Sequence, residues 1–258
     1  MPSDTVVLQS YRTIDVPAWI STCMGTVRSW TQDQGWHYAC MGDEFLSMAP
    51  PWARQQCGHN LYAITDLSRL LWIQQVLSDP KAPYRRAIWV DADVLVMNPQ
   101  ALGKAVSACE DHALARELFM KTPPNRGISF RHGVNNAFMV FDRGSPMPER
   151  YMDACWRQLR ATPSGEVERT ALGPAILQSL HRQSPIRLID GIGLYTPGMM
   201  HELAQGEGTL YQRYLCEWGR APLAANLCHF MRNATPQASR PNFDAIYARA
   251  IARLLCGP

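Results

Sequence analysis

The sequence lacks several features that mark whole classes of protein. Its 25 basic and 22 acidic residues leave a net charge of only +3, and no run of lysine or arginine could follow a nucleic-acid backbone, so we expect no nucleic-acid partner. No stretch reaches the roughly 20 apolar residues of a membrane span, and the first residues lack the basic and apolar regions of a secretory signal. These absences predict a cytoplasmic protein.

Closely spaced cysteines are missing as well. The eight cysteines contain no C-x-x-C pair, which argues against a structural zinc site. A chain of 258 residues with 47% hydrophobic residues can bury a large core without disulfides. We therefore expect one domain over residues 1–258, with cysteines that are mostly reduced and buried.

Strand and helix patterns are present along the whole chain, and their alternation predicts an α/β fold. Short apolar runs predict strands at residues 6–8, 36–41, 87–90, 136–141 and 186–189. Helical spacing predicts helices at residues 17–30, 66–77, 148–159, 174–180 and 242–255. Thr65 and Asn242 are the expected N-caps of the second and the last helix, and Pro50 with Pro51 predicts a loop.

Two aspartates follow directly after the strand predicted at residues 87–90. Asp91 and Asp93 therefore stand at the carboxyl end of a strand, where open α/β sheets place their ligands. Carboxylate oxygens suit a hard divalent cation such as Mn²⁺ or Mg²⁺ and leave coordination sites for phosphate oxygens. The triplet alone is a weak signal, because a turn with solvated carboxylates gives the same pattern.

A haloacid-dehalogenase-like phosphatase is an alternative interpretation of the same triplet. In such an enzyme Asp91 would attack phosphorus and Asp93 would handle the proton. Those phosphatases carry the aspartate pair close to the N-terminus, followed by a lysine and a second acidic pair. Here about ninety residues precede Asp91 and no matching acidic pair follows, so this is the weaker alternative.

Asp66 and Arg69 form a second pair of charged residues on a predicted helix. Residues three apart share a helix face, so the carboxylate and the guanidinium can reach one ligand. The carboxylate can accept from ribose hydroxyls, and the guanidinium can bind phosphate or brace a metal-binding aspartate. The simpler alternative is an ordinary surface ion pair.

The order of these motifs resembles glycosyltransferase family 32, a DXD group that includes mannosyltransferases, galactosyltransferases and glucosylating bacterial toxins. The resemblance covers nearly the whole chain. It rests on Gln9, residues 17–30, Asp66-x-x-Arg69, Asp91-x-Asp93, and residues 135–139, 170–175 and 228–230. It implies a GT-A fold, with a mixed central sheet flanked by helices.

The resemblance also implies an activity. The expected reaction is metal-dependent transfer of a sugar from a nucleotide-sugar donor, UDP-sugar favoured over GDP-sugar, with retention. The acceptor would be a hydroxyl of a glycan or a lipid-linked saccharide, as in capsular or lipopolysaccharide biosynthesis. The departing phosphate would help to take the acceptor proton, so no dedicated nucleophile is needed. An inverting enzyme would need a general base, for which Asp142, Asp190 and Glu202 are candidates.

The donor-binding residues follow from the resemblance position by position. Gln9, Asp66 and Arg69 match positions that contact the donor, the latter two at its ribose and phosphates. Asp91 and Asp93 match the contacts to the sugar, the ribose and the metal. The metal and Arg69 would stabilise the leaving group electrostatically, which makes these residues catalytic as well as binding.

Two later motifs complete the expected site. His229 matches the residue that completes the metal coordination, and a neutral imidazole is a competent ligand for Mn²⁺. Asn135 or Asn136 falls where the family places an amide near the donor's anomeric carbon. The structural alternatives are a core histidine and a turn at the start of a strand.

Some features depart from the family pattern. Its Gly-Gly-x-Tyr run before the DXD is replaced by a longer and more basic segment at residues 79–86. Glycosyltransferase family 8 is a weaker match, because its His-x-x-Gly-x-x-Lys run is missing here. A third alternative is a scaffold protein that binds a nucleotide sugar without turnover. The clustered charges argue against it, since such charges are costly to bury without a use.

The last predicted helix suggests a further partner. Its apolar residues lie on one side and are Ile246, Ala250, Ile251, Leu254 and Leu255. The ordinary use of such a side is packing on the core. The alternative is peripheral contact with the inner face of a membrane, with Arg249 and Arg253 towards lipid phosphates.

Overall fold

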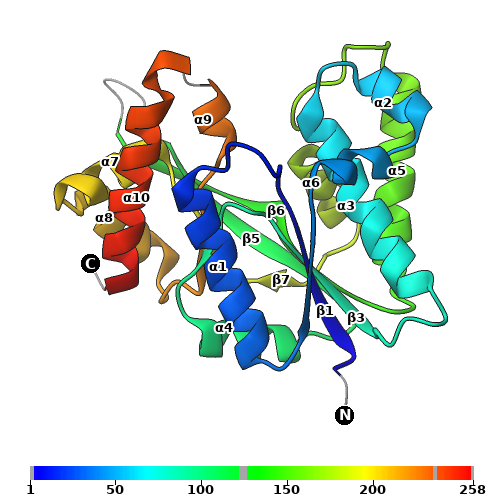
Figure 1. Cartoon of the computed structure of the whole chain (residues 1–258), viewed down its shortest axis with the longest axis horizontal. Coiled ribbons are helices and arrows are strands. Elements are labelled where there is room, and N and C mark those ends of the chain that lie inside the picture. Colours follow the sequence, from blue (N-terminus) through cyan, green and yellow to red (C-terminus); the bar gives the residue numbers. More distant parts are fainter. Residues whose placement is uncertain (1–2, 122–126, 235–236, 257–258) are drawn as a thin grey trace.

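A computed structural model describes residues 3–121, 127–234 and 237–256 (Figure 1). Its centre is a six-stranded mixed sheet with the strand order β2-β1-β3-β6-β5-β7. The strands are β1 (Thr5–Ser10), β2 (His37–Met41), β3 (Arg86–Val90), β5 (His112–Lys121), β6 (Ser129–Asp142) and β7 (Leu188–Ile189). Strand β1 is parallel to β2 and β3, whereas β6 is antiparallel to both β3 and β5.

Helices cover both faces of this sheet (Figure 1). One face carries the short 3-10 helix η1 (Asp43–Met48), α2 (Pro51–Cys57), α3 (Leu61–Ser78), α5 (Met147–Ala161) and α6 (Pro174–Gln183). The other side carries α1 (Ala18–Asp33), α4 (Pro99–Ser107), α7 (Pro197–Gln205), α8 (Thr209–Trp218), α9 (Phe230–Ala234), η2 (Gln237–Ser239) and α10 (Arg240–Cys256). The predicted α/β architecture is confirmed.

Alternation along the central strands explains why both faces are apolar. Val6 and Leu8 pack towards α3, whereas Val7 between them packs towards α1 and α4. In β3, Trp89 and Ile88 divide in the same way. Strands buried on both faces read as continuous apolar runs, which is why they could be predicted from short segments.

A second, three-stranded sheet brings the C-terminal part of the chain to the end of β3. It contains β4 (Val94–Val96), β9 (Ala224–Asn226) and β8 (Ile192–Leu194), in the order β4-β9-β8. Strand β4 starts one residue after Asp93 and is antiparallel to β9. The residues that follow β9 therefore lie beside the Asp91–Asp93 turn.

Two predicted helix starts and one predicted loop are wrong. Helix α3 begins at Leu61, because Asn60 is its N-cap and accepts from the Ala63 amide at 3.3 Å. Thr65 lies inside this helix and donates to the Leu61 carbonyl. Pro51 starts helix α2 instead of a loop, since proline suits the first helical turn. The last helix begins before Asn242, at Arg240.

The apolar side of α10 packs against α7 and α1. Its expected inward residues lie there, except that Leu255 is 47% exposed because it is at the last turn. No helix within the described parts of the chain is long and apolar enough to cross a bilayer. All eight cysteines are free, and five of them are buried, namely Cys23, Cys57, Cys109, Cys155 and Cys228.

Candidate active site at the carboxyl ends of the central strands

Asp91 and Asp93 lie at the end of β3, as expected from the sequence. The Asp91 amide donates to the Ala137 carbonyl at 2.8 Å, which extends the pairing of β3 with β6. A turn follows, closed by a 3.1 Å hydrogen bond from the Val94 amide to the Asp91 carbonyl. Because β1 and β3 are parallel, their carboxyl ends meet at this edge of the sheet.

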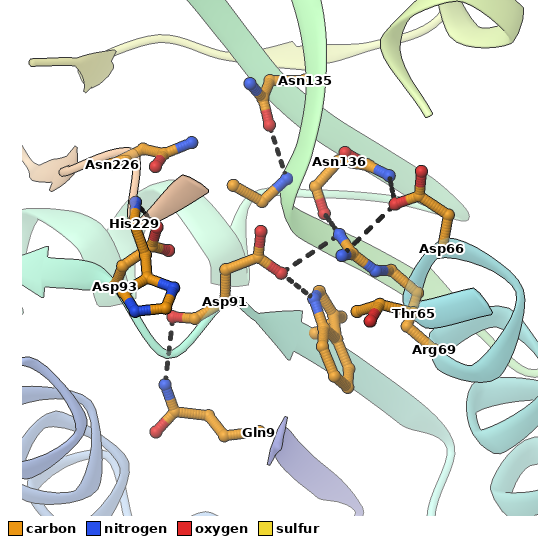
Figure 2. Close-up of polar contacts among 12 residues, drawn as sticks. Gln9, Thr65, Asp66, Arg69, Asp91, Asp93, Asn135, Asn136, Asn226 and His229 are labelled. Carbon is orange, nitrogen blue, oxygen red and sulfur yellow. Dashed lines mark hydrogen bonds and ion pairs between the residues drawn. The ribbon is translucent and has the colours of Figure 1, made fainter. Parts of the chain in front are cut away.

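Arg69 connects α3 to this edge (Figure 2). Its Nη1 donates to the Asn136 carbonyl at 2.9 Å and lies 3.1 Å from Asp91 Oδ1. Its Nη2 lies 3.3 Å from Asp66 Oδ1. The guanidinium also lies over the Trp89 ring, 5.2 Å from the ring centre. Arg69 is only 5% exposed, so the alternative of a surface ion pair does not hold.

Asp66 is buried between three elements. Asn136 Nδ2 donates to Asp66 Oδ1 at 2.8 Å and lies 3.2 Å from the Tyr151 hydroxyl. An ideal Cβ at Gly173 would lie 2.7 Å from Asp66 Oδ2, so glycine leaves the room for this carboxylate. Burial raises the pKa of Asp66 to about 6, although Arg69 and Asn136 act in the opposite direction.

Asp93 is held by the chain that follows β9. The His229 amide donates to Asp93 Oδ2 at 2.6 Å, and the Leu227 amide donates to the Asp93 carbonyl at 3.0 Å. The imidazole Nε2 of His229 shares a 2.9 Å hydrogen bond with the Tyr11 hydroxyl. Burial lowers the pKa of His229 to about 4, so its ring is neutral at pH 7.

A divalent cation fits the chemistry of this aspartate pair. Burial, and then the neighbouring Asp91 carboxylate, raise the pKa of Asp93 well above its usual range. A cation beside both carboxylates would offset their repulsion. Within the described residues, no three His, Cys, Asp or Glu side chains are gathered as a metal-ligand set. His229 contacts Asp93 through its main chain, and its role as a metal ligand stays a prediction.

Gln9 lies beneath the aspartate turn. Its Nε2 donates to the Asp91 carbonyl at 3.2 Å, and its Oε1 accepts from the Tyr38 hydroxyl at 2.9 Å. The side chain is completely buried. Gln9 therefore positions the main chain of Asp91, and direct contact with a ligand stays a prediction.

Asn135 and Asn136 lie on the same strand but have different surroundings. Asn136 is buried against Asp66, as described above. Asn135 is half-buried, accepts from the Ala137 amide at 2.7 Å and donates to Glu117 Oε2 at 2.6 Å. The structure thus brings both asparagines to the edge that carries Asp91, on β6 next to β3 (Figure 2).

Sequence reasoning did not identify two residues near this edge. Glu117 on β5 is a buried carboxylate, and Asn226 at the end of β9 accepts from the Cys228 amide at 3.0 Å. Asn226 is a polar residue within an apolar segment, which is its only signal in the sequence, and the mixed sequence around Glu117 gives no signal.

The three candidate general bases have structural partners elsewhere. Asp142 forms an ion pair with Arg86, which is at the opposite end of β3 from Asp91. Asp190 is paired with Arg116 and Arg220. Glu202 accepts from the Leu210 amide at 2.8 Å. These contacts give each of the three acids a structural role, and none of them requires the acid to act as a general base.

Comparison of whole structures shows which fold this is. The galactosyltransferase LgtC, in complex with donor and acceptor sugar analogs, matches over 96% of this chain and 95% of its own, with a TM-score of 0.50 and 9% sequence identity. Mouse xyloside xylosyltransferase 1, in its apo form, matches over 88% of this chain and 98% of its own, with a TM-score of 0.47 and 14% identity.

A glycosyltransferase involved in the glycosylation of the major capsid of PBCV-1 matches over 93% of this chain and 98% of its own. Its TM-score is 0.46 and its identity is 14%. No family model and no curated protein matches the sequence. The chain has the GT-A glycosyltransferase fold, and membership of family 32 stays a prediction.

Proposed function

We propose that residues 1–258 form a single GT-A glycosyltransferase domain. It would move a sugar from a nucleotide-sugar donor, UDP-sugar favoured over GDP-sugar, to a hydroxyl of a glycan or lipid-linked saccharide, with retention. The observation that supports this most strongly is the buried network of Asp66, Arg69 and Asn136 against Asp91, next to Asp93. A protein without a ligand at this edge gains little from burying such charges. LgtC, with the same fold, is a galactosyltransferase.

The two aspartates would hold the metal ion. Asp91 and Asp93 are the ligands that a hard cation such as Mn²⁺ or Mg²⁺ prefers, and the bound ion would neutralise charge on the leaving diphosphate. Arg69 lies behind Asp91 and is buried, so it braces the carboxylate instead of reaching far into solvent. Asp66 would accept from the donor ribose, as the position in the family pattern implies.

The contacts of the three candidate general bases are consistent with a retaining reaction, which needs no such base. Asp142, Asp190 and Glu202 are all engaged in other contacts, as shown above. The acceptor proton would go to the departing phosphate, and Asn135 or Asn136 would lie near the anomeric carbon. A phosphatase mechanism is less well supported, because the Oδ1 atom of its would-be nucleophile, Asp91, accepts from Trp89 at 2.6 Å and from Arg69.

Calorimetry tests the donor site. UDP and GDP are titrated into the wild type with and without Mn²⁺, and the better ligand is then titrated into Asp93→Ala. We expect binding of one nucleotide that requires the metal, and a loss of at least about 100-fold in Asp93→Ala, as for an ion ligand whose charge is removed. Asp153→Ala, an exposed aspartate on α5, is the matched control and should bind normally.

Two results would count against the proposal. Absence of binding for both nucleotides under all metal conditions would remove its central support. Tight binding without hydrolysis or transfer of any UDP-sugar or GDP-sugar would favour the non-catalytic scaffold instead. Hydrolysis of the nucleotide sugar in the absence of an acceptor is therefore measured on the same samples.

A further inference from the structure

An arginine outside the network described above connects two distant segments of the chain. The guanidinium carbon of Arg169 is 5.1 Å from the centre of the Tyr62 ring and 5.9 Å from the centre of the Phe230 ring. Tyr62 is in the first turn of α3, and Phe230 is the first residue of α9. These two helices belong to opposite sides of the central sheet (Figure 1). The mechanism proposed above gives this arginine no role.

Both aromatic rings adjoin residues of the proposed donor site. Tyr62 precedes Asp66 by one helical turn on the same face of α3, which is about 6 Å along the helix axis. Phe230 directly follows His229, whose amide donates to Asp93 Oδ2 at 2.6 Å. The arginine that contacts both rings therefore lies at the outer end of this site, one helical turn beyond Asp66.

The segment that carries Arg169 is fixed to the start of α3. Asn60 Nδ2 donates to the carbonyls of Val167 and Glu168, at 2.9 and 3.1 Å. The Ala171 amide donates to the Glu168 carbonyl at 3.1 Å and closes a turn around Arg169. Because the main chain is anchored and two rings contact the guanidinium, binding of a ligand to this side chain requires little further ordering.

The charge of Arg169 is exposed and has no counter-charge among the described residues. Within residues 3–121, 127–234 and 237–256, its side chain takes part in no ion pair or hydrogen bond, and the neighbouring acid Glu168 does not pair with it. Cation–π contacts hold a guanidinium without using its N–H donors. These donors therefore remain available in a flat fork that matches a carboxylate or a phosphate.

Arg12 has a similar arrangement next to His229. Its guanidinium carbon is 5.6 Å from the centre of the Tyr11 ring, and the Tyr11 hydroxyl shares a 2.9 Å hydrogen bond with His229 Nε2. Arg12 is exposed and donates to the Asp15 carbonyl at 2.7 Å, and it has no ion pair in the described parts of the chain. Two exposed cations without carboxylate partners near one site favour an anionic ligand there.

We propose that Arg169 makes the enzyme select an acceptor with a negatively charged group, a carboxylate or a phosphate, and binds that group beside Tyr62 and Phe230. The inference rests on the proposed glycosyltransferase function and adds the charge class of its acceptor. Arg12 would add attraction at longer range. The donor's diphosphate is a second source of negative charge, and the experiment below separates it from the acceptor.

Two variants of Arg169 change its charge and its shape separately. Arg169→Gln removes the charge, and Arg169→Lys keeps the charge without the flat fork. Arg160→Gln is the matched control, because Arg160 is also exposed and lies 5.9 Å from the centre of an aromatic ring, that of Trp52. NMR measures the affinities for methyl glucoside, methyl glucuronide and glucose 6-phosphate, with and without the nucleotide and Mg²⁺. Calorimetry measures the affinity for UDP and GDP with Mg²⁺.

We expect the wild type to bind at least one of the two charged sugars about tenfold more tightly than methyl glucoside, the range of one charge-assisted hydrogen bond. The sugar that shows this preference identifies the group as a carboxylate or a phosphate. Arg169→Gln should lose the preference, Arg169→Lys should keep part of it, and Arg160→Gln should keep all of it. The affinity for the nucleotide should stay within about twofold of the wild type in all three variants.

Three results would overturn this proposal. The first is a wild type that binds charged and neutral sugars equally or binds none of them, and the second is a preference that survives in Arg169→Gln. The third is a loss of about tenfold in nucleotide affinity in the same variant, which would assign Arg169 to the donor's diphosphate. Binding of a charged sugar through Arg169 by a protein that binds neither UDP nor GDP would confirm the anion site and overturn the proposed function instead.

Discussion

The two ends of strand β3 each have an arginine–aspartate pair, and the pairs are built differently. At the amino end, Arg86 donates to both oxygens of Asp142, at 2.6 and 2.9 Å. It also donates to the carbonyls of Val106 and Cys109, at 2.9 and 2.7 Å. Such a bidentate guanidinium, with at least one hydrogen bond from each of its three nitrogens, is typical of a structural ion pair.

At the carboxyl end the corresponding contacts are longer and less complete. Arg69 lies 3.1 Å from Asp91 and 3.3 Å from Asp66, and its buried Nε has no hydrogen-bond partner within the described residues. Burial raises the pKa of Asp66 to about 6 and also raises the pKa of Asp93. The protein thus holds Asp66 and Asp93 in their charged form less well than water does.

The comparison indicates which end is prepared for a ligand. The pair at the amino end needs nothing further, whereas the carboxyl end would be stabilised by donors or a cation that the described chain does not supply. At one end of the strand the charges have few partners, and at the other end they are well paired. This pattern is expected when a protein gives up some local stability for binding.

Replacing the arginine at either end should have the largest effects on the free energy of unfolding, and only one of the two replacements should abolish nucleotide binding. Arg69→Met leaves Asp66 and Asp91 without their counter-charge, so we expect the free energy of unfolding to fall by about 3–5 kcal/mol and nucleotide binding to be lost. Arg86→Met should cost about 1–3 kcal/mol and keep nucleotide binding. Urea unfolding and calorimetry measure both effects.

Arg69→Lys is the variant to test if Arg69→Met does not fold. Lysine keeps the charge but cannot brace two carboxylates at once. It should fold and bind the nucleotide more weakly than the wild type. Normal binding by either Arg69 variant, or loss of binding in Arg86→Met, would show that the two ends do not differ in function.

Neutralising the aspartate should change the free energy of unfolding in opposite directions at the two ends, for Asp66 and for Asp142. The difference between about 6 and the ordinary value of 3.8 for the pKa of Asp66 corresponds to about 3 kcal/mol. Asp66→Asn should therefore raise the free energy of unfolding at pH 8 by up to about 3 kcal/mol while weakening nucleotide binding. Asp142→Asn should lower it, because a bidentate charged pair is lost. Destabilisation by Asp66→Asn in urea unfolding would contradict this account.

The pH dependence of the same variant gives the sign independently. A carboxyl group with a raised pKa binds its proton more tightly in the folded state, so its contribution to stability is lost as the pH rises from about 4 to about 6. The stability of Asp66→Asn relative to the wild type should increase over this window and stay level above it. Urea unfolding of both proteins at each pH measures the difference. A difference that does not change with pH would exclude Asp66 as the titrating group.

Much of this edge could be predicted from local sequence. The four-residue apolar run before Asp91 and Asp93 fixes their place at the end of a strand, because a strand buried on both faces is apolar throughout. The three-residue spacing of Asp66 and Arg69 predicted that they share one face of a helix. It could not show that the face is buried, since α3 is apolar on most sides and its neighbours come from distant parts of the chain.

The rest depends on contacts between distant segments. Strand β5 was not predicted, because its sequence mixes apolar, charged and small residues without clean alternation and is a strand through pairing with β6. Glu117 was missed with it. Asn226 is in a three-residue strand, which is too short to give a pattern. The contact of His229 with Tyr11 joins residues 218 positions apart, and no local signal exists for it.

The mildest test adds one methyl group beside Asp66. Gly173 is the N-cap of α6, and an ideal Cβ there would lie 2.7 Å from Asp66 Oδ2 and 3.1 Å from Asn136 Nδ2. Gly173→Ala should therefore cost about 1–3 kcal/mol through overpacking. Gly25 in α1 has nothing within 4 Å of an ideal Cβ, so Gly25→Ala should stabilise the chain by about 0.5–1 kcal/mol.

A double-mutant cycle connects this cost to the carboxylate. In Asp66→Ala the colliding oxygen, Oδ2, is gone, so adding Gly173→Ala to that variant should cost much less than it does in the wild type. Urea unfolding of the four proteins gives the coupling free energy between the two positions. Equal costs in both backgrounds would mean that the methyl group strains something other than Asp66. A marked coupling would show that the glycine is needed because an under-compensated carboxylate occupies the start of α6, a demand that the saturated pair at the other end of β3 does not make.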